Sequence, residues 1–327
     1  MPAHGRIPAV HVVGAGGIGC AVGYALLAAG AEVVFVDADS EKVRYGNVKG
    51  VGVESHGSRT ARFVEFTDWQ PDAKAIVLLC TKCFDNARVI AKLPNEENLI
   101  PIQNGFDPEL DKRKHLVEGV ASFVSECLPS RPVTRITRAG KLHIGYRRQP
   151  ASYDPPDLAN RLRRCKLFSV QFREDILPYK YTKLMYNAAI SPLAAAAGLD
   201  NSGLLAVPKT RRLFFALLNE NYSILHGAGI PLGKIGPFHP DLVAKILRRP
   251  WLAGAMGWAF YPTLRGTYCS MARDLPAGPT EADYYNGHLI RLAGDRPCPL
   301  NRKVCDLVKR MECQRIQPAL NVLDELG

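Results

Sequence analysis

Three glycines with a fixed spacing are the first chemical signal in this sequence. Residues 14–19 read GAGGIG, a GxGxxG pattern. Gly14 permits a tight turn, Gly16 lets the backbone approach a pyrophosphate, and Gly19 lets a following helix pack closely on the preceding strand. The free N–H groups at the start of that helix would then face the anion. We therefore predict a dinucleotide-binding site made of Gly14, Ala15, Gly16, Gly17, Ile18 and Gly19.

The elements around this motif are those that a dinucleotide site requires. The apolar run Ala9–Val13 predicts a strand and Ile18–Ala29 predicts a helix. A second predicted strand, Glu32–Val36, ends on Asp37. A carboxylate at this place accepts hydrogen bonds from the adenosine ribose and repels a 2′-phosphate, which slightly favours NADH over NADPH. Lys42 follows closely and could attract a phosphate instead, or Asp37 could simply open a surface loop over residues 37–42.

A second set of polar residues lies in the C-terminal half and could act on a carbonyl. Lys183 and Asn187 are four residues apart in a helical stretch, so they share one helix face. An ammonium beside an amide can protonate and orient a carbonyl group, as general acid catalysis requires. Pro192 lacks an N–H and leaves the carbonyl of Ala188 free. The alternative for Lys183 is a solvated helix lysine.

Two further polar residues stand at the ends of predicted elements. Thr280 is suited to an N-cap, which would place Glu281 in the first helical turn, where the helix dipole favours its ionised form. Dipole compensation alone would also explain such a glutamate. Asn104 directly follows the predicted strand Leu99–Gln103, and loops at the carboxyl ends of parallel strands bind ligands. The alternative is a turn asparagine before Gly105.

The order of the predicted elements defines the fold class. Further strands are predicted at residues 75–79, 99–103, 120–124, 141–146 and 169–173, with a crossover helix at 85–93 and a loop at 149–157. After residue 175 strand signals nearly vanish, and helices are predicted at residues 178–197, 209–227, 240–247, 280–293 and 301–313. We predict an α/β N-terminal Rossmann domain with a mostly parallel sheet over residues 1–177, followed by an all-α C-terminal domain over residues 178–327.

The composition is that of an ordinary globular protein, with 327 residues, 47% of them hydrophobic, and a formal net charge of +11. Apolar runs are shorter than a membrane span and the N-terminus lacks a signal peptide, so we expect a cytoplasmic protein. Basic clusters are short and lack interleaved aromatic residues, which argues against nucleic acid as a partner. Nine scattered cysteines, with one CxxC at Cys80 and Cys83, indicate buried free thiols and no metal site.

Five landmarks follow one another along the chain in an informative order. They are Gly14–Gly19; Thr81-Lys82 with Asp85; Gln103-Asn104-Gly105; Lys183-Leu184 with Asn187 and Pro192; and Cys269-Ser270-Met271 with Asp274, Thr280-Glu281 and Asn286-Gly287. In this order they resemble the ketopantoate reductase (2-dehydropantoate 2-reductase) family. The resemblance implies a Rossmann domain and a helical domain with the substrate between them, and hydride transfer from a nicotinamide cofactor to the keto carbon of a small 2-keto acid, most of all ketopantoate.

The same resemblance assigns roles to individual residues. Lys183 would donate the proton to the keto oxygen, with Glu281 assisting it. Lys82 and Asn104 would lie near the cofactor, for which the family habit is NADPH. The substrate would be held by Asn104, Asn187, Ser191, Asn201 and Ser270.

Two departures from the family pattern bear on cofactor and substrate. The family usually has a basic residue near the end of the second strand, where this chain has Asp37, and often a second asparagine where this chain has Ser191. Two other functions stay open: a dehydrogenase of the same two-domain plan acting on another keto acid, a polyol or an imine, and a non-catalytic dinucleotide-binding protein. We expect a small keto acid as partner, no nucleic acid and no membrane, and the helical domain offers surfaces for a homodimer.

Overall fold

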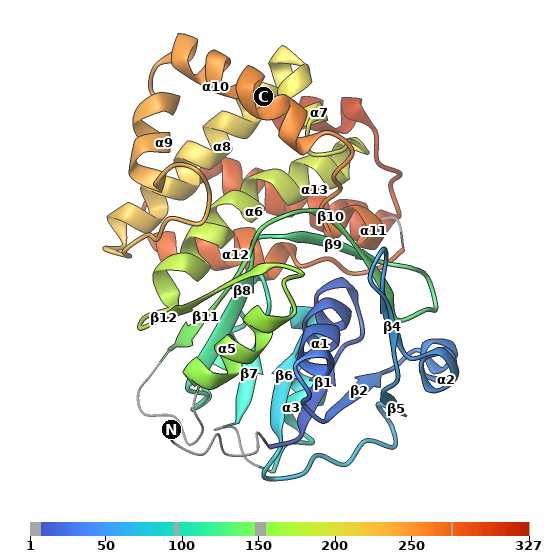
Figure 1. The fold of residues 1–327 in the computed structure, drawn as a ribbon. Helices are drawn as coiled ribbons and strands as arrows, with labels where there is room; N and C mark the ends of the chain where they lie inside the picture. The colour runs from blue at the N-terminus through green and yellow to red at the C-terminus, as the bar shows by residue number, and fades with distance from the viewer. Residues whose placement is uncertain (1–7, 95–97, 148–154, 276, 327) are drawn as a thin grey trace. The chain divides into compact units, whose positions relative to one another are not determined.

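The computed structural model describes residues 8–94, 98–147, 155–275 and 277–326. The chain divides into two compact units, which we call the sheet unit (residues 1–103 and 107–176) and the helical unit (residues 104–106 and 177–327). Figure 1 shows the strands gathered in the sheet unit, while the described elements of the helical unit are helices. The predicted fold class, an α/β Rossmann domain followed by an all-α domain, is confirmed.

A parallel sheet of five strands is the centre of the sheet unit. Its order is β5-β2-β1-β6-β7, and every neighbouring pair is parallel. The strands are β1 (Val10–Val13), β2 (Val33–Asp37), β5 (Arg62–Glu65), β6 (Ile76–Leu79) and β7 (Leu99–Pro101). The central strands β1 and β6 are buried along their whole length and are almost entirely apolar, as expected where both sheet faces are covered. Helix α1 (Gly17–Ala28) follows β1 directly and lies beside it in Figure 1.

Two smaller sheets complete this unit. One has the order β4-β3-β10-β9 and contains β3 (Val51–Val53), β4 (Gly57–Arg59), β9 (Val124–Cys127) and β10 (Val133–Arg138). The other has the order β12-β11-β8 and contains β8 (Val117–Ala121), β11 (Lys141–Tyr146) and β12 (Ser169–Arg173). The remaining helices are α2 (Ser40–Lys49), the 3₁₀ turn η1 (Cys83–Asp85), α3 (Asn86–Ile90), α4 (Pro108–Asp111) and α5 (Pro155–Arg164). Strand β9 contacts α1, so a distant segment of the chain reaches the glycine motif.

Several local expectations differ from the structure. Residues 120–124, predicted as one strand, span the end of β8 and the start of β9, because the chain leaves the sheet at residues 122–123. Residues 155–157, the end of the predicted 149–157 loop, open helix α5, whose first turn tolerates proline; residues 148–154 lie outside the described residues. The surface loop over residues 37–42, given as the alternative for Asp37, ends early, because the Asp39 carboxylate accepts hydrogen bonds from the N–H groups of residues 41 and 42 and so caps α2.

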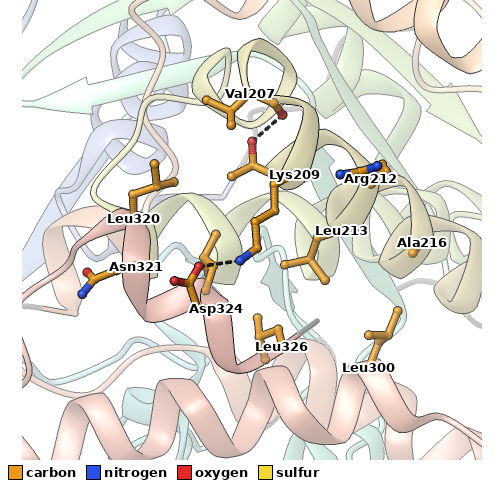
Figure 2. A pocket seen from close by; sticks show the side chains of 12 residues that line it. Val207, Lys209, Arg212, Leu213, Ala216, Leu300, Leu320, Asn321, Asp324 and Leu326 are labelled. Atoms are coloured by element: carbon orange, nitrogen blue, oxygen red, sulfur yellow. Dashed lines mark hydrogen bonds and ion pairs between the residues drawn. The ribbon is translucent and has the colours of Figure 1, made fainter.

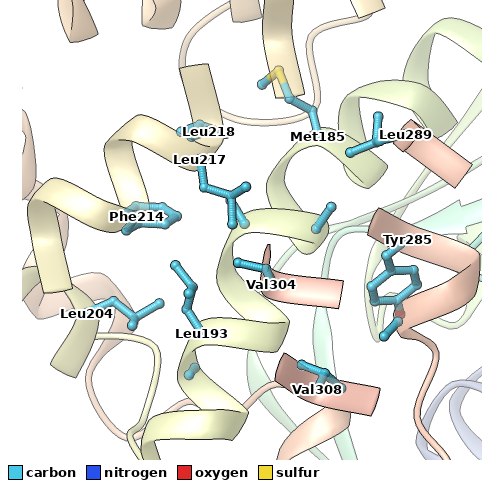
Figure 3. Packing of buried hydrophobic residues seen from close by; sticks show 14 of the residues in the cluster. Met185, Leu193, Leu204, Phe214, Leu217, Leu218, Tyr285, Leu289, Val304 and Val308 are labelled. Atoms are coloured by element: carbon cyan, nitrogen blue, oxygen red, sulfur yellow. The ribbon is translucent and has the colours of Figure 1, made fainter. Parts of the chain in front are cut away.

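The helical unit is built around α6 (Leu177–Ala197). This helix contacts α8 (Pro208–Gly227), α12 (Ala282–Ala293) and α13 (Pro299–Gln314). Figure 3 shows apolar side chains of these helices meeting in one core, including Leu193, Leu217 and Val304. The remaining helices are α7 (Gly203–Ala206), α9 (Pro240–Leu247), α10 (Pro250–Leu264), α11 (Met271–Asp274) and the 3₁₀ helix η2 (Leu320–Leu326).

Helix α10 was not predicted from the sequence. Its 15 residues include no charged side chain, so it lacks the polar face by which an amphipathic helix is recognised. Trp251 and Trp258 are nevertheless 72% and 82% exposed, and Leu242 of α9 is exposed as well. The described helical unit therefore carries an apolar surface on α9 and α10.

Candidate functional site

The glycine motif forms a tight turn between β1 and α1, which we call the glycine loop (Gly14–Gly19). Gly14 has φ of +97°, and a Cβ there would lie 2.8 Å from the backbone nitrogen of Thr81. A Cβ on Gly19 would lie 2.0 Å from the carbonyl oxygen of Gly14, so α1 can start here only with glycine. A Cβ on Gly16, by contrast, would meet nothing within 4 Å. The backbone at Gly16 is therefore open to an approaching ligand.

Asp37 links the glycine loop to the end of β2. Its Oδ2 accepts a 2.8 Å hydrogen bond from the N–H of Ala15, and its Oδ1 accepts one of 3.0 Å from the N–H of Asp39. The ammonium of Lys42 lies 3.3 Å from the same Oδ2. Burial is the largest single influence on the pKa of Lys42 and lowers it, but the charge and hydrogen bond of Asp37, together with the sulfurs of Cys127 and Cys20, raise the pKa overall, so Lys42 stays protonated. The structure thus pairs the predicted ribose-binding carboxylate of Asp37 with the ammonium of Lys42, which stands three residues after Asp39, the N-cap of α2.

A buried polar network orders the loops that follow β6 and β7. The amide of Gln103 donates 2.8 Å to the carbonyl of Thr81 and 2.7 Å to the side chain of Asn86. Asn86 in turn donates 3.1 Å to Gln103 and 2.8 Å to the carboxylate of Asp107. Lys82 follows Thr81 and caps η1, so this network holds the backbone from which the predicted cofactor lysine projects.

Strand β9 closes the glycine loop from a position that the sequence did not reveal. A Cβ on Gly17 would lie 2.6 Å from the carbonyl oxygen of Ser125, so this glycine is required by the strand rather than by a ligand. The Ser125 hydroxyl is buried and has no hydrogen-bond partner among the described residues. A buried hydroxyl without a protein partner is commonly satisfied by a bound water, an ion or a ligand. No local pattern marks Ser125, because it follows the glycine loop by about a hundred residues.

In the helical unit, α6 carries the predicted substrate residues on one face. Lys183, Asn187 and Ser191 recur at four-residue intervals, as the sequence predicted. Lys183 and Asn187 are half-buried and Ser191 is buried. The thiol of Cys269 lies 3.4 Å from the carbonyl oxygen of Ser191, which holds the loop containing the exposed Ser270 against this helix.

The turn after α6 presents Asn201 in a fixed orientation. Its backbone N–H donates 2.9 Å to the carbonyl of Thr267, and its side-chain Nδ2 donates 3.0 Å to the hydroxyl of the same residue. The Oδ1 atom is buried and has no partner among the described residues. Thr267 fixes the amide so that its acceptor oxygen is left for another group. No local sequence pattern marks Thr267 as the partner of Asn201, because the two residues are 66 positions apart.

Glu281 is buried at the start of α12. It is the N-cap residue and not part of the first turn, because the chain enters helical geometry only at Ala282, whose N–H lies 3.2 Å from the Thr280 hydroxyl. The Glu281 carboxylate accepts a 3.1 Å hydrogen bond from the hydroxyl of Tyr285. Helix α12 is tied to α6 by Asn286, whose Nδ2 lies 2.9 Å from the carbonyl oxygen of Ala188.

Asn104 belongs with the helical unit although it follows a sheet strand. Phe106, two residues on, donates its N–H to the carbonyl of Tyr284 at 3.0 Å. Its ring stacks on Tyr181 and His288, with centroids 4.4 and 4.5 Å apart. These aromatic contacts anchor residues 104–106 to α6 and α12, on which Lys183, Asn187 and Glu281 also lie.

The residues that the sequence singled out therefore form two groups. The sheet unit holds the glycine loop, Asp37 and the Lys82 backbone around the carboxyl ends of parallel strands. The helical unit holds Lys183 and its predicted companions Asn104, Asn187, Ser191, Asn201, Ser270 and Glu281 on or around α6 and α12.

A cavity of about 830 Å³ lies elsewhere in the helical unit. Figure 2 shows it between α8 and the C-terminal helix η2, with Lys209 and Asp324 joined by a 2.6 Å ion pair and leucines beneath them. None of its lining residues is one of the predicted site residues. The cavity is separate from the candidate site.

The part of the chain that the structure describes contains neither a metal-binding cluster nor a membrane-spanning helix. No group of three or more His, Cys, Asp or Glu side chains there could hold a metal ion. None of the described helices combines the length and apolar character needed to cross a membrane. All nine cysteines are free of disulfides, and burial raises the pKa of Cys80, in the CxxC, to about 12.

The glycine loop follows the first strand of a parallel sheet, and the all-α unit that comes after it carries a lysine and an amide side chain on one helix face. This combination is that of the NAD(P)-dependent oxidoreductases built on a Rossmann domain. The profile of the family described as Ketopantoate reductase PanE/ApbA matches residues 10–148, and that of its C-terminal domain matches residues 175–312. The chain belongs to the ketopantoate reductase family.

Individual relatives are distant but match along nearly their whole length. The chain is 21% identical over 314 residues to a 2-dehydropantoate 2-reductase of Archaeoglobus fulgidus, which covers 94% of this chain and 99% of that protein. A D-mandelate dehydrogenase solved with NADH and anilino(oxo)acetate has a TM-score of 0.77 at 19% identity, covering 94% of this chain and 99% of that one. A dimeric ketopantoate reductase from Staphylococcus aureus has a TM-score of 0.70 at 16% identity, covering 94% and 100%. At this identity the solved structures establish the fold.

Proposed function

We propose that this protein reduces a small 2-keto acid to the 2-hydroxy acid, with ketopantoate as the first candidate and pantoate as its product. The observation that carries the proposal is the α6 face with Lys183, Asn187 and Ser191, which lies in a unit that also holds the buried carboxylate of Glu281. A protein that only binds a dinucleotide has no need of a proton donor beside amide groups.

Lys183 is the proton donor in this proposal. Its ammonium donates a proton to the keto oxygen as the keto carbon accepts a hydride, so that a carbonyl becomes an alcohol. Glu281 stabilises the charged ammonium, and the Tyr285 hydroxyl fixes one carboxylate oxygen by its 3.1 Å hydrogen bond. Because Tyr285 is fully buried, Glu281 has little freedom to turn away.

The substrate carboxylate needs hydrogen-bond donors of its own. Asn104, Asn187 and Ser270 supply amide or hydroxyl donors from the helical unit. Asn201 presents a buried Oδ1 without a partner, which is suited to a substrate hydroxyl rather than to a carboxylate oxygen. Ketopantoate carries such a hydroxyl, so this acceptor favours a hydroxylated keto acid.

The sheet unit fits a bound nicotinamide dinucleotide, which supplies the hydride. The open backbone at Gly16 and the first N–H groups of α1 receive the pyrophosphate, and the unpartnered Ser125 hydroxyl lies beside them. Asp37 slightly favours NADH, because its carboxylate stands where a 2′-phosphate would come. Lys42 beside it could bind the 2′-phosphate of NADPH, which is the usual cofactor of the family.

The decisive experiment is a panel of 2-keto acids assayed with NADH and with NADPH, followed by the loss of nicotinamide absorbance. Ketopantoate, 2-oxoisovalerate and benzoylformate test the size of the substituent and the value of the hydroxyl. Turnover of ketopantoate with the highest kcat/KM supports the proposal. If a bulky aromatic keto acid is preferred, the general keto-acid reductase stands and ketopantoate is wrong. If no keto acid, polyol or imine reacts while a dinucleotide binds, the protein is a non-catalytic binder.

We also propose that the protein forms a homodimer through the apolar surface of α9 and α10. Trp251 and Trp258 expose large apolar areas there, and such areas are commonly covered by a partner. The relative from S. aureus is dimeric, which supports a dimer for this chain without indicating its interface. Light scattering of the wild type and of Trp258→Glu tests it, with a monomeric wild type as the contrary result.

A further inference from the structure

Two cysteines far apart in the sequence meet beneath the glycine loop. Cys20 lies in the first turn of α1, and Cys127 is the last residue of β9. The Sγ of Cys20 lies 3.2 Å from the carbonyl oxygen of Ala15, and the Sγ of Cys127 lies 3.5 Å from the same oxygen. When Cys127 is ionised, the Cys20 S–H can donate to its thiolate instead of to the Ala15 carbonyl. One loop carbonyl therefore brings both sulfur atoms together.

The two thiols differ in the way that a reactive pair requires. Cys20 is completely buried, and burial raises the pKa of its thiol. Cys127 is only half-buried, and the hydrogen bond from Cys20 lowers its pKa, an effect that the charge of nearby Lys42 reinforces. Because the thiolate is the nucleophile, Cys127 is the sulfur that an oxidant in solution meets first, and Cys20 stands behind it to resolve the product.

We propose that Cys20 and Cys127 form an oxidation site that a peroxide converts into a disulfide under the glycine loop. The Cys127 thiolate attacks one peroxide oxygen and the O–O bond breaks, which leaves a sulfenic acid on Cys127. The hydroxide released takes up the proton that the Cys127 thiol lost on ionising and leaves as water. The Cys20 sulfur then attacks the Cys127 sulfur, the S–O bond breaks, and a second water leaves with the Cys20 proton. Two thiols lose two electrons in total, and the peroxide accepts them.

The disulfide would act on the glycine loop through Ala15. In the reduced pair, the thiols surround the Ala15 carbonyl, while the Ala15 N–H bonds to Asp37 at 2.8 Å. A disulfide has no S–H to donate, and its sulfurs must approach to about 2.05 Å. Strand β9 is already in contact with α1 at Gly17 and Ser125, so these two elements cannot move closer there. The two sulfur atoms can therefore approach each other only if the Cys127 end of β9 and the glycine loop change conformation. This consequence rests on the proposed dinucleotide site: oxidation should weaken NADH binding on the order of tenfold, the effect of losing one to two hydrogen bonds.

The site itself is tested without any dinucleotide. The reduced full-length protein is treated with hydrogen peroxide, free thiols are alkylated, and peptides are mapped by mass spectrometry before and after dithiothreitol. We expect one cross-linked pair of peptides, containing Cys20 and Cys127, that dithiothreitol separates. Cys127→Ser should abolish it, while Cys165→Ser, a half-buried thiol of the same unit, should leave it unchanged. Absence of this cross-link in the wild type would overturn the proposal. So would a Cys127→Ser variant in which Cys20 forms a cross-link to another cysteine in a yield equal to that of the wild-type pair.

A separate titration tests the consequence for binding. NADH fluorescence is measured with the reduced wild type, the oxidised wild type and both forms of Cys127→Ser. We expect a tenfold loss of affinity on oxidation in the wild type and none in Cys127→Ser. If the disulfide forms and NADH affinity does not change, the link to the glycine loop is wrong. If the reduced protein binds no dinucleotide at all, the proposed function is wrong. The peptide mapping then still shows whether Cys20 and Cys127 form a disulfide.

Discussion

The side chain of Asn286 donates a 2.9 Å hydrogen bond to the carbonyl oxygen of Ala188. That carbonyl has no helical partner, because the residue four positions on is Pro192, which lacks an N–H. A free carbonyl in the middle of α6 could have faced a ligand, but the structure uses it to bind α12 to α6. The proline therefore serves the packing of the two helices that carry Lys183 and Glu281.

Loss of this hydrogen bond should destabilise the helical unit. Asn286→Ala leaves the buried carbonyl of Ala188 and the amide oxygen of Asn301 without this donor. A buried polar group left unsatisfied costs about 1–3 kcal/mol. Urea unfolding should therefore show a lower midpoint with an unchanged slope. The surface variant Asn321→Ala is the control, and equal midpoints for the two variants would contradict the argument.

Two glycine replacements should separate binding from folding. Gly16→Val places its side chain in open space, so we expect a normally folded protein that no longer binds NADH or NADPH. Gly19→Val must overlap the carbonyl oxygen of Gly14, so we expect a protein that is strongly destabilised or insoluble. Thermal melting and fluorescence titration of both variants check this. Normal dinucleotide binding by Gly16→Val would show that the pyrophosphate does not lie there.

Asp37 should determine the choice between the two cofactors. Asp37→Ala removes the carboxylate that opposes a 2′-phosphate and releases Lys42 from its ion pair, so NADPH should gain relative to NADH. The double variant Asp37→Ala, Lys42→Ala should lose that gain, because the free ammonium is gone. The ratio of the two dissociation constants is the measurement. A wild type that already prefers NADPH strongly would contradict the role given to Asp37.

Lys183 should control turnover without affecting the cofactor. Lys183→Ala should lower kcat by about 10²–10⁴-fold, the usual worth of general acid catalysis, with unchanged NADH affinity. Lys245→Ala, an exposed lysine on α9, is the matched control and should leave kcat unaltered. Glu281→Gln should also lower kcat, since it removes the charge that stabilises the ammonium. A loss of less than tenfold in Lys183→Ala, with hydride transfer shown to be rate-limiting, would exclude Lys183 from the role.

Because Ser191 stands where relatives often have asparagine, the substrate pocket should offer one hydrogen-bond donor fewer than theirs. A lost hydrogen bond to substrate costs on the order of 1 kcal/mol, so Ser191→Asn should lower the KM for ketopantoate by several fold. Ser191 is buried, so a thermal melt must accompany the kinetics to show that the larger side chain is accommodated. A stable variant that loses ketopantoate turnover, beside a wild type that prefers another keto acid, would overturn the substrate assignment.

Features that depend on short spacing were predictable from the sequence. The GxGxxG pattern requires neighbouring residues only, and the positive φ of Gly14 and the contact of Gly19 with the Gly14 carbonyl follow from that local turn. The close approach of Thr81 to Gly14 depends on the neighbouring strand. Lys183, Asn187 and Ser191 share a face because any α-helix repeats every 3.6 residues. The change from strands to helices near residue 177 was visible for the same reason, since hydrophobic periodicity is a local property.

The tertiary structure alone decided the partners that these residues meet. Ser125 and Cys127 reach the glycine loop because β9 pairs within a separate sheet, and no local pattern encodes that pairing. Thr267 orients Asn201 across 66 residues, and Asn286 reaches Ala188 across 98. Such contacts arise when apolar faces pack and leave buried polar groups that must find a hydrogen-bond partner, which depends on the whole packed arrangement and not on the spacing within any one element.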